Sequence, residues 1–258
     1  MPIITLTTDF GLDDGYVGTM QGVILSIAAG ATLVDLSHQV PPQDVRAGAF
    51  VLYQAVPFFP RDTIHLVVVD PGVGSQRRAL AVHTSHGTFV APDNGVLSYV
   101  LASTSVHEAV SLTNPAYRLP QVSATFHGRD IFAPAAAHLA NGVPLTELGP
   151  RAINLVRLAV PEAEFTPGGD LIAHVLHVDH FGNLILDVTA GDLAEEVTFE
   201  LAGRRIEGLS RTFADVAPGD PVAYIGSTRD HVEIALRDNN AAEGIGVDVG
   251  DEVLIWGA

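Results

Sequence analysis

Three short polar segments hold the side chains best suited to chemistry, and each follows a strand-like apolar run. They are TTDFG at 7–11, VVVDPGVGSQRR at 67–78 and FHGRD at 126–130. The first two runs are aliphatic or β-branched and as long as a buried strand, so Asp9 and Asp70 directly follow strand ends. Open α/β sheets bind their ligands at that edge, and we expect the active site there.

Asp9, Asp70 and Arg77 are the first candidate site residues. The Asp9 carboxylate, in a glycine turn, suits the two hydroxyls of a ribose, although a turn or cap aspartate gives the same pattern. Asp70 precedes a proline and two glycines, a backbone that leaves room for a ligand. Arg77 is placed to pair with Asp70 across this turn and to keep the carboxylate ionised, and an ion pair in a surface turn is the structural alternative.

His127 lies between Phe126 and Gly128 at a predicted strand-to-helix junction. The unperturbed pKa of histidine, about 6.5, is close to working pH, which makes His127 a candidate general acid or base. A histidine that is only hydrogen-bonded within the fold is the alternative.

The segment HVLHVDHFGN supports two hypotheses. His174 and His177 suggest a metal site, but their odd spacing puts them on opposite faces of a strand, and we expect no metal. The DHFGN turn is better interpreted as a recognition loop. In it Asp179 and Asn183 offer an acceptor and an amide, and Phe181 offers an apolar wall.

Alternating strand and helix patterns over roughly the first 150 residues predict a layered α/β domain. In the first helix Val17, Met20 and Ile24 have the spacing of one buried face, and Asp13 or Asp14 is expected to cap it. Further on, residues 79–82 and 88–91 are expected to pair as a hairpin, and residues 129–140 to form one helix.

From about residue 155 the helix patterns fade, and short strand-like runs separated by turn residues predict a small barrel or sandwich. The segment 161–170 is the most linker-like in the chain. We therefore expect an N-terminal α/β domain at 1–160 and a C-terminal all-β, barrel-like domain at 161–258. RDNNAAEGIG at 237–246 is predicted as a loop whose exposed backbone suits a flat heterocycle.

The composition is that of an ordinary globular chain of 258 residues, with 30 acidic and 13 basic residues and no cysteine. The acidic excess argues against nucleic acid as a partner and is compatible with a cationic ligand. Without cysteine, disulfides, thiol nucleophiles and thiolate zinc sites are excluded. Since the N-terminus lacks a signal-peptide pattern and no apolar run is long enough to cross a membrane, we expect a cytoplasmic protein with no membrane partner.

Eight motifs together are far more specific than any one of them: TTDFGLDDGYVG, VVDPGVG, RR, APDNG, HGRD, DHFGN, TFAD and NNAAE. With these motifs in this order the chain resembles, over essentially its whole length, the S-adenosyl-L-methionine hydroxide adenosyltransferases, the water-using relatives of the fluorinase and chlorinase. The resemblance implies an N-terminal α/β domain, a smaller C-terminal β-barrel and a homotrimer. It also implies S-adenosyl-L-methionine as substrate, held between the N-domain of one subunit and the C-domain of its neighbour, and no cofactor.

The resemblance also assigns roles position by position. The catalytic Asp-Arg-His set of the family falls on Asp70, Arg77 and His127. Its substrate-binding positions fall on Asp9 for the ribose, on Asp179, Asn183 and Ser227 for the methionine part and on Phe213, Asn240 and Ala241 for the adenine. Phe126 and Phe181 are further candidate substrate-binding residues, taken from their neighbours in the sequence and not from the family. Three positions depart from the halogenases, which carry a tyrosine at Asp70, a threonine at Val73 and, in the fluorinase, a serine at Gly128.

The implied reaction is attack of water or hydroxide on ribose C5′, giving adenosine and L-methionine. The sulfonium already activates the carbon, so the site has to hold the water and receive its proton. Positioning contributes about 7 to 11 kcal/mol and a placed base about 10²- to 10⁴-fold, so geometry should outweigh base strength. Whether Asp70 or His127 accepts the proton stays open at this level.

Three other functions remain as alternatives. They are a non-catalytic binder of S-adenosylmethionine or adenosine, a halide-using synthase of 5′-halo-5′-deoxyadenosine, and a metal-dependent hydrolase. A carboxylate beside the attack site repels an anion and tolerates neutral water, which favours hydrolysis over halide chemistry.

Overall fold

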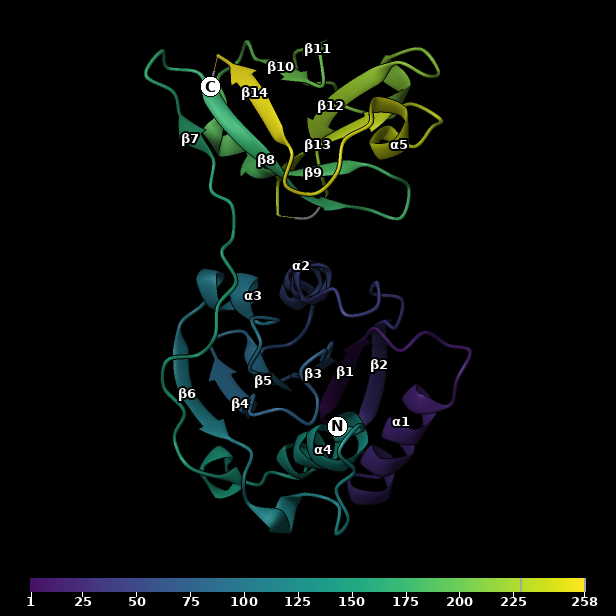
Figure 1. Ribbon diagram of the computed structural model, residues 1–258, viewed down its shortest axis with the longest axis vertical. Coiled ribbons are helices and arrows are strands. Elements are labelled where there is room, and N and C mark those ends of the chain that lie inside the picture. The colour runs from purple at the N-terminus through teal and green to yellow at the C-terminus, as the bar shows by residue number, and fades with distance from the viewer. Residues whose placement is uncertain (228, 258) are drawn as a thin grey trace. The chain divides into compact units, whose positions relative to one another are not determined.

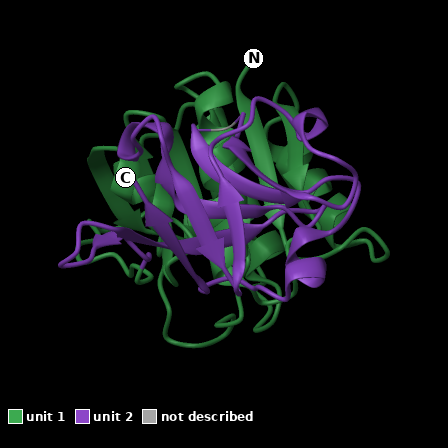
Figure 2. Ribbon diagram, turned by 90° about the horizontal axis from the view of Figure 1, so that it is seen from above, with its two compact units in different colours: residues 1–159 green, residues 160–258 purple. Residues whose placement is uncertain are grey.

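The computed structural model describes residues 1–227 and 229–257. The chain divides into two compact units, Met1–Ala159 and Val160–Ala258, which Figure 2 colours separately. The N-terminal unit combines helices with a mixed sheet, and the C-terminal unit is almost entirely β (Figure 1). The predicted fold class, a layered α/β fold followed by a barrel-like all-β fold, is confirmed.

The N-terminal unit is built on one six-stranded sheet with the order β2-β1-β3-β5-β4-β6. Its strands are β1 Ile3–Thr8, β2 Thr32–Ser37, β3 Ile64–Val68, β4 Ala79–Thr84, β5 Gly87–Pro92 and β6 Val106–Ser111. Strands β2, β1, β3 and β5 run parallel, and β4 is antiparallel to both of its neighbours. Because Thr8 of β1 pairs with Val68 of β3, Asp9 and Asp70 follow adjacent strand ends at one edge.

Helices cover both faces of this sheet (Figure 1). They are α1 Tyr16–Ile27, α2 Val45–Ala55, α3 Ser98–Ser103 and α4 Ala133–Ala140, with one-turn helices at Val56–Phe58, Pro115–Tyr117 and Leu145–Leu148 and one π-helical turn, η3, at Gly128–Phe132. α1 packs on α4, and α2 packs on α3. Within the described ranges, no helix has the length and apolar content needed to cross a membrane.

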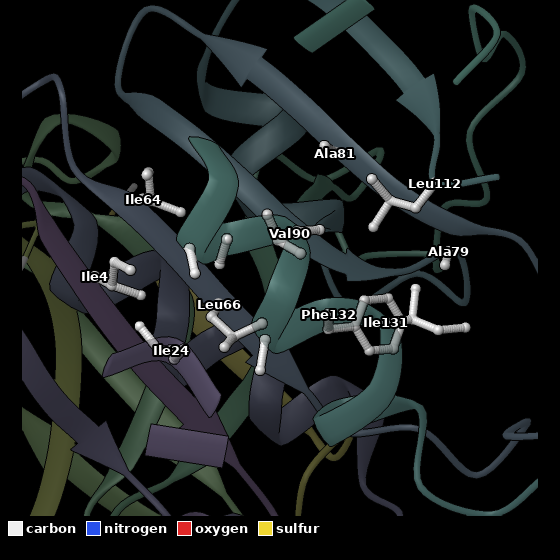
Figure 3. Close-up of a cluster of buried hydrophobic side chains, with 14 of the residues drawn as sticks. Ile4, Ile24, Ile64, Leu66, Ala79, Ala81, Val90, Leu112, Ile131 and Phe132 are labelled. Atoms are coloured by element: carbon white, nitrogen blue, oxygen red, sulfur yellow. The ribbon is translucent and has the colours of Figure 1, made fainter. Parts of the chain in front are cut away.

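Side chains of β3 alternate between the two cores, as strand geometry requires. Leu66 and Val68 pack into the core beneath α1 and α4, whereas Val67 and Val69 pack into the core beneath α2 and α3. Figure 3 shows the first of these cores, where Leu66 and Phe132 lie among aliphatic side chains of β1, β3 and β5. The strand that leads to Asp70 is therefore packed on both faces.

The helix starts differ from the sequence expectation in one case. Asp44 is the N-cap of α2, where its Oδ1 accepts a hydrogen bond from the Ala47 amide at 2.9 Å. The N-cap of α1 is Gly15, with no side-chain cap, so the expectation that Asp13 or Asp14 caps this helix is wrong. The two aspartates are exposed because the helix begins only at Tyr16.

The C-terminal unit is an antiparallel sheet that nearly closes into a barrel. Its strand order is β11-β10-β14-β8-β9-β13-β12, and β7 pairs with β8. The strands are β7 Glu164–Phe165, β8 Leu171–Val178, β9 Leu184–Thr189, β10 Thr198–Leu201, β11 Arg204–Glu207, β12 Pro221–Ile225, β13 His231–Leu236 and β14 Glu252–Trp256. Past β11, the Ser210 amide donates to the Ala223 carbonyl of β12 at 2.8 Å, which draws the two edge strands together.

Short elements occupy four segments of the C-terminal unit. One-turn helices lie at Ala190–Asp192 and Phe213–Asp215. The linker-like segment contains β7, and the predicted loop at 237–246 contains helix α5, Ala241–Ile245. The Asn240 side chain caps α5 by accepting from the Glu243 amide at 3.0 Å. A polar residue that looked like a turn former therefore begins a helix.

His65 is a buried histidine in the centre of the N-terminal sheet. Its ring stacks on Phe89 with centroids 4.9 Å apart, and its Nδ1 lies 2.9 Å from Oγ1 of Thr5. Burial lowers the pKa of His65 from 6.5 to about 4. The unfolded chain therefore binds a proton that the native state resists, and stability should fall by about 3 kcal/mol as the pH drops through that interval.

Urea unfolding at about pH 7 and about pH 4.5 tests this expectation. His65→Gln should be less stable than the wild type at neutral pH and should lose less stability on acidification. His83→Gln, at an exposed histidine of β4, should keep the wild-type pH dependence. Equal losses in the wild type and His65→Gln would contradict the assignment to His65.

Candidate active site

Asp70, Arg77 and His127 form one hydrogen-bonded chain in the N-terminal unit. The Arg77 guanidinium grips both Asp70 oxygens, with its Nε 2.8 Å from Oδ1 and its Nη2 on Oδ2. The same Nη2 lies 2.8 Å from Nδ1 of His127. The Arg77 and Asp70 side chains are 9% and 5% exposed, so this ion pair is largely shielded from solvent.

This chain fixes the hydrogen-bonding roles of the imidazole. A guanidinium can only donate hydrogen bonds, so Nδ1 of His127 must accept the one from Arg77. The proton of the neutral ring therefore resides on Nε2, which points its N–H away from Arg77 as a donor. Among Asp70, Arg77 and His127, the lone pairs that stay free to accept a proton are those of the Asp70 carboxylate.

The electrostatic surroundings keep His127 neutral. Burial lowers the pKa of His127, and the nearby charge of Arg77 lowers it further, while Asp70 acts in the opposite direction. Arg118 adds to the lowering and Asp130 opposes it. The imidazole is thus uncharged at neutral pH, as its hydrogen bond from Arg77 requires.

Two loops bring these side chains together. The loop after β3 turns sharply at Gly74, where φ is +78° and an added Cβ would lie 2.6 Å from the Ala124 carbonyl oxygen. Only glycine permits that close approach between the segments that carry Arg77 and His127. Asp130, fully buried in η3, accepts from the Ser123 amide at 2.8 Å and fastens the segment before His127 to the helix.

A cavity of about 680 Å³ lies next to these hydrogen-bonded side chains, and Asp9, Asp70, Phe126 and His127 line it. Asp9 accepts the Gln43 amide at 2.8 Å through Oδ2. Phe10, Tyr16 and Phe126 form an edge-to-face aromatic cluster on one wall, with ring centroids 5.3 to 5.9 Å apart. The cavity thus joins a carboxylate wall, an aromatic wall and the neutral imidazole.

A second group of predicted residues gathers in the C-terminal unit. Asp179 holds the DHFGN turn, since its Oδ1 accepts the Phe181 and Asn183 amides, both at 2.8 Å, and its Oδ2 accepts Nδ2 of Asn183 at 2.8 Å. The Gly182 carbonyl accepts the amide of Ala242, one residue past Ala241. The turn is thereby locked onto the start of α5.

The remaining predicted residues lie on or beside β12. The Phe213 ring contacts Tyr224 with centroids 4.7 Å apart, and the Tyr224 hydroxyl donates to Glu233 of β13. Burial raises the pKa of Glu233, and the Asp179 charge raises it further, against the effect of the Tyr224 hydrogen bond. Ser227 is exposed in the turn after β12, and Phe181 is 73% exposed.

Several residues at these sites had not been predicted. They are Tyr16 and Arg118 in the N-terminal unit and Tyr224 and Glu233 in the C-terminal unit. Glu233 interrupts the apolar strand HVEIAL, which is a usable signal for a special role. Tyr16 and Arg118 offer no such signal, because their positions depend on packing between distant segments.

His174, one of the two histidines that suggested a metal site, pairs with a carboxylate instead. Nδ1 of His174 pairs with Oδ2 of Asp187 at 2.9 Å. Across residues 1–227 and 229–257, no three histidine, aspartate or glutamate side chains are grouped so as to hold a metal ion.

Comparisons with known proteins agree with this architecture. A protein from Salinispora tropica named (R)-S-adenosyl-L-methionine hydrolase is 45% identical over 98% of this chain and 97% of its own length. A fluorinase from Actinoplanes sp. is 31% identical over 88% of each chain. A crystal structure of a conserved protein from Thermotoga maritima superposes with a TM-score of 0.89, at 35% identity and with 99% of each chain covered.

Two family models match almost end to end. The SAM hydroxide adenosyltransferase N-terminal domain matches residues 4–149, and the C-terminal domain of the same family matches residues 173–254. The predicted resemblance is confirmed, and the chain belongs to the SAM hydroxide adenosyltransferase family.

Proposed function

We propose that the protein hydrolyses S-adenosyl-L-methionine to adenosine and L-methionine. The observation that carries the proposal is the Asp70–Arg77–His127 chain on the wall of an open cavity, at a strand edge that also holds Asp9. A relative 45% identical over nearly the full chain carries the name of that activity. No cofactor is required, because the sulfonium of the substrate is itself the leaving group.

In this proposal a water molecule attacks C5′ of the ribose from the side opposite the sulfur. The C–O bond forms while the C5′–S bond breaks, and its electron pair stays on sulfur as the neutral thioether of methionine. His127 donates its Nε2–H to the water oxygen and positions it. Asp70 accepts the proton of the water, because Nδ1 of His127 is already occupied by Arg77. We therefore propose Asp70 as the base.

The other predicted residues hold the substrate in this proposal. Asp9 accepts the ribose hydroxyls, and Phe126 borders the sugar. In the C-terminal unit the methionine part is assigned to Asp179, Asn183 and Ser227 with Phe181 as an apolar wall, and the adenine to Phe213, Asn240 and Ala241. The hydrogen bonds that lock the DHFGN turn onto α5 support this grouping, since they fix both sets of groups in one frame.

Hydrolysis in ¹⁸O-labelled water tests the proposal. Purified protein incubated with S-adenosylmethionine should release methionine and adenosine carrying one ¹⁸O at the 5′ position. A chelator should leave the rate unchanged, and added chloride should give no halogenated nucleoside. A rate that a chelator abolishes, a halogenated product, or tight binding without turnover would each replace the proposal with one of its alternatives.

A homotrimer with the substrate between the N-domain of one subunit and the C-domain of its neighbour is part of the same proposal and rests on the family resemblance. Light scattering should give three times the 27.1 kDa of one chain. A monomer that retains full activity would contradict the shared site. The cytoplasmic location and the absence of a nucleic-acid partner stay predictions.

Gly182→Ala should separate substrate binding from chemistry. At Gly182 φ is +87° and an added Cβ would lie 2.1 Å from Oδ1 of Asn240, so the Asn240 side chain, which caps α5, must shift away from the turn. We expect KM to rise about tenfold, as a strain of about 1 to 2 kcal/mol implies, with little change in kcat. Gly203→Ala is the matched control, because φ is +74° there and nothing lies within 4 Å of the added Cβ. Equal KM values for the two variants would contradict the assignment.

A further inference from the structure

A second cavity, of about 350 Å³, shares a wall with the proposed active site. His127 lines both cavities, and Arg77 lines the second one. We call this second space the rear cavity, and the cavity of about 680 Å³ described above the substrate-facing cavity. The two side chains therefore form a partition, with the substrate-facing cavity on one side and the rear cavity on the other.

The rear cavity is positively charged in a strongly acidic protein. Arg77, Arg78 and Arg118 all line it, and none of the described residues that line it is acidic. The chain has only 13 basic residues against 30 acidic ones, so three arginines around one small cavity are a marked local concentration. A cavity lined by charge of one sign attracts ions of the opposite sign.

Two of these arginines are neutralised within the fold and the third is not. Arg77 pairs with Asp70, and Arg78 pairs with Asp93. Arg118 forms no ion pair with the described residues, its Nη2 donates to the Leu112 carbonyl, and its Nε is buried with no described hydrogen-bond partner. Burial lowers the pKa of Arg118, as expected for a charge that lacks a counter-ion. One positive charge at the rear cavity is thus uncompensated.

Hydrogen-bond donors accompany this charge. The hydrogen bonds of Arg77 and Arg118 to the described residues use Nε or Nη2, which leaves Nη1 of both without an acceptor among them. Ser111 and Thr113 also line the rear cavity, and the described residues offer their hydroxyls no hydrogen-bond partner. Charge and free donors in one place are what a small anion requires.

We infer that the rear cavity binds a small monovalent inorganic anion such as chloride beside Arg118, and that the bound anion sets the protonation of His127 from behind. One uncompensated charge matches one monovalent ion. Binding of the anion is independent of the proposed hydrolysis. An effect of the anion on turnover, through the protonation of His127, rests on that proposed function.

The effect on His127 follows from the charges that face it. Arg77 from the loop after β3 and Arg118 from the segment before η3 disfavour the imidazolium, while Asp70 after β3 and Asp130 in η3 favour it. A bound anion beside Arg118 offsets the positive charge of Arg77 and Arg118. We expect it to raise the pKa of His127 by about one unit, the smaller end of the effect of an opposite charge at close range.

An NMR titration of His127 in the full-length protein tests this inference without any turnover. The His127 ring signal, identified by its absence in His127→Ala, is followed against pH in sodium chloride and in sodium gluconate at the same ionic strength. Chloride should raise the apparent pKa saturably by about one unit. Identical titrations in the two salts would overturn the inference.

Variants locate the effect. Arg118→Gln should raise the pKa of His127 in gluconate and abolish the response to chloride. Arg61→Gln removes the same charge from the exposed turn before β3, at the end opposite Asp70, and should behave as the wild type. A full chloride response in folded Arg118→Gln would place the ion elsewhere and overturn the inference.

Bromide allows the anion to be located in the wild-type protein, without any variant. Crystals of the wild-type protein grown in sodium bromide should show an anomalous peak in the rear cavity beside Arg118. A peak only in the substrate-facing cavity, or none in either, would overturn the inference even if Arg118→Gln does not fold. Since neither measurement involves S-adenosylmethionine, a failure of the proposed hydrolysis would be detected separately.

Discussion

Asp70→Asn should lower kcat by at least about 10²-fold and as much as about 10⁴-fold, with little change in KM. The amide cannot accept the proton of the attacking water, and it also loses the charge that Arg77 grips through two bonds. His127→Ala should lower kcat by at least about 10²-fold, because the water then lacks the donor that positions it. Steady-state release of adenosine measures both effects.

Two control variants test whether the loss of rate depends on the position of the substitution. Asp62→Asn and His107→Ala make the same chemical changes at exposed positions outside the site and should keep wild-type rates. Near-normal turnover in Asp70→Asn and His127→Ala would remove both residues from the mechanism.

The pH profile of the wild type gives a further check on His127. Its lowered pKa predicts that kcat holds as the pH falls through 6.5 and declines only below it, when a protonated ring can no longer accept from Arg77. A decline that begins above pH 6.5 would conflict with a neutral, buried imidazole.

Phe132→Ala should have the largest effect on stability, a loss of about 3 to 5 kcal/mol. Phe132 is fully buried in the core beneath α1 and α4, as Figure 3 shows, and an alanine leaves a cavity there. The Phe132 ring also lies 5.2 Å from the Arg77 guanidinium carbon. Loss of that support should lower kcat by about tenfold, since a shielded cation–π contact is worth about 1 to 2 kcal/mol.

Phe132→Leu is the matched variant for this prediction. Leucine fills most of the space and should cost less than about 2 kcal/mol, but it has no ring face for Arg77. Urea unfolding and kcat measured on both variants should therefore show a large difference in stability and a similar loss of rate. Wild-type kcat in Phe132→Leu would show that Arg77 does not depend on the ring.

The fold class was predictable because most of its signals are local. The run at 64–69 is buried on both faces and contains β3, and the hairpin expected at 79–82 and 88–91 is formed by β4 and β5. β6 was missed since His107 and Glu108 make an edge strand look polar. The expected continuous helix at 129–140 instead begins with a π-helical turn, whose register depends on contacts with the segment before it.

The candidate site divides in the same way. The contact between Asp70 and Arg77 spans seven residues of one turn, and its chemistry alone suggested it. His127 reaches Arg77 across 50 residues of chain, and only the order of the motifs indicated that approach. Arg118 and the rear cavity had no signal, because a free guanidinium is recognised only when its surroundings are known.

The partition formed by Arg77 and His127 has a consequence for how such an enzyme can be altered. Ser111 and Thr113 line only the rear cavity, so in the proposed arrangement substitutions there would change the solvation behind the imidazole and leave the proposed substrate-binding groups in place. Acid tolerance and salt sensitivity can therefore diverge among related enzymes while their substrate preference stays the same.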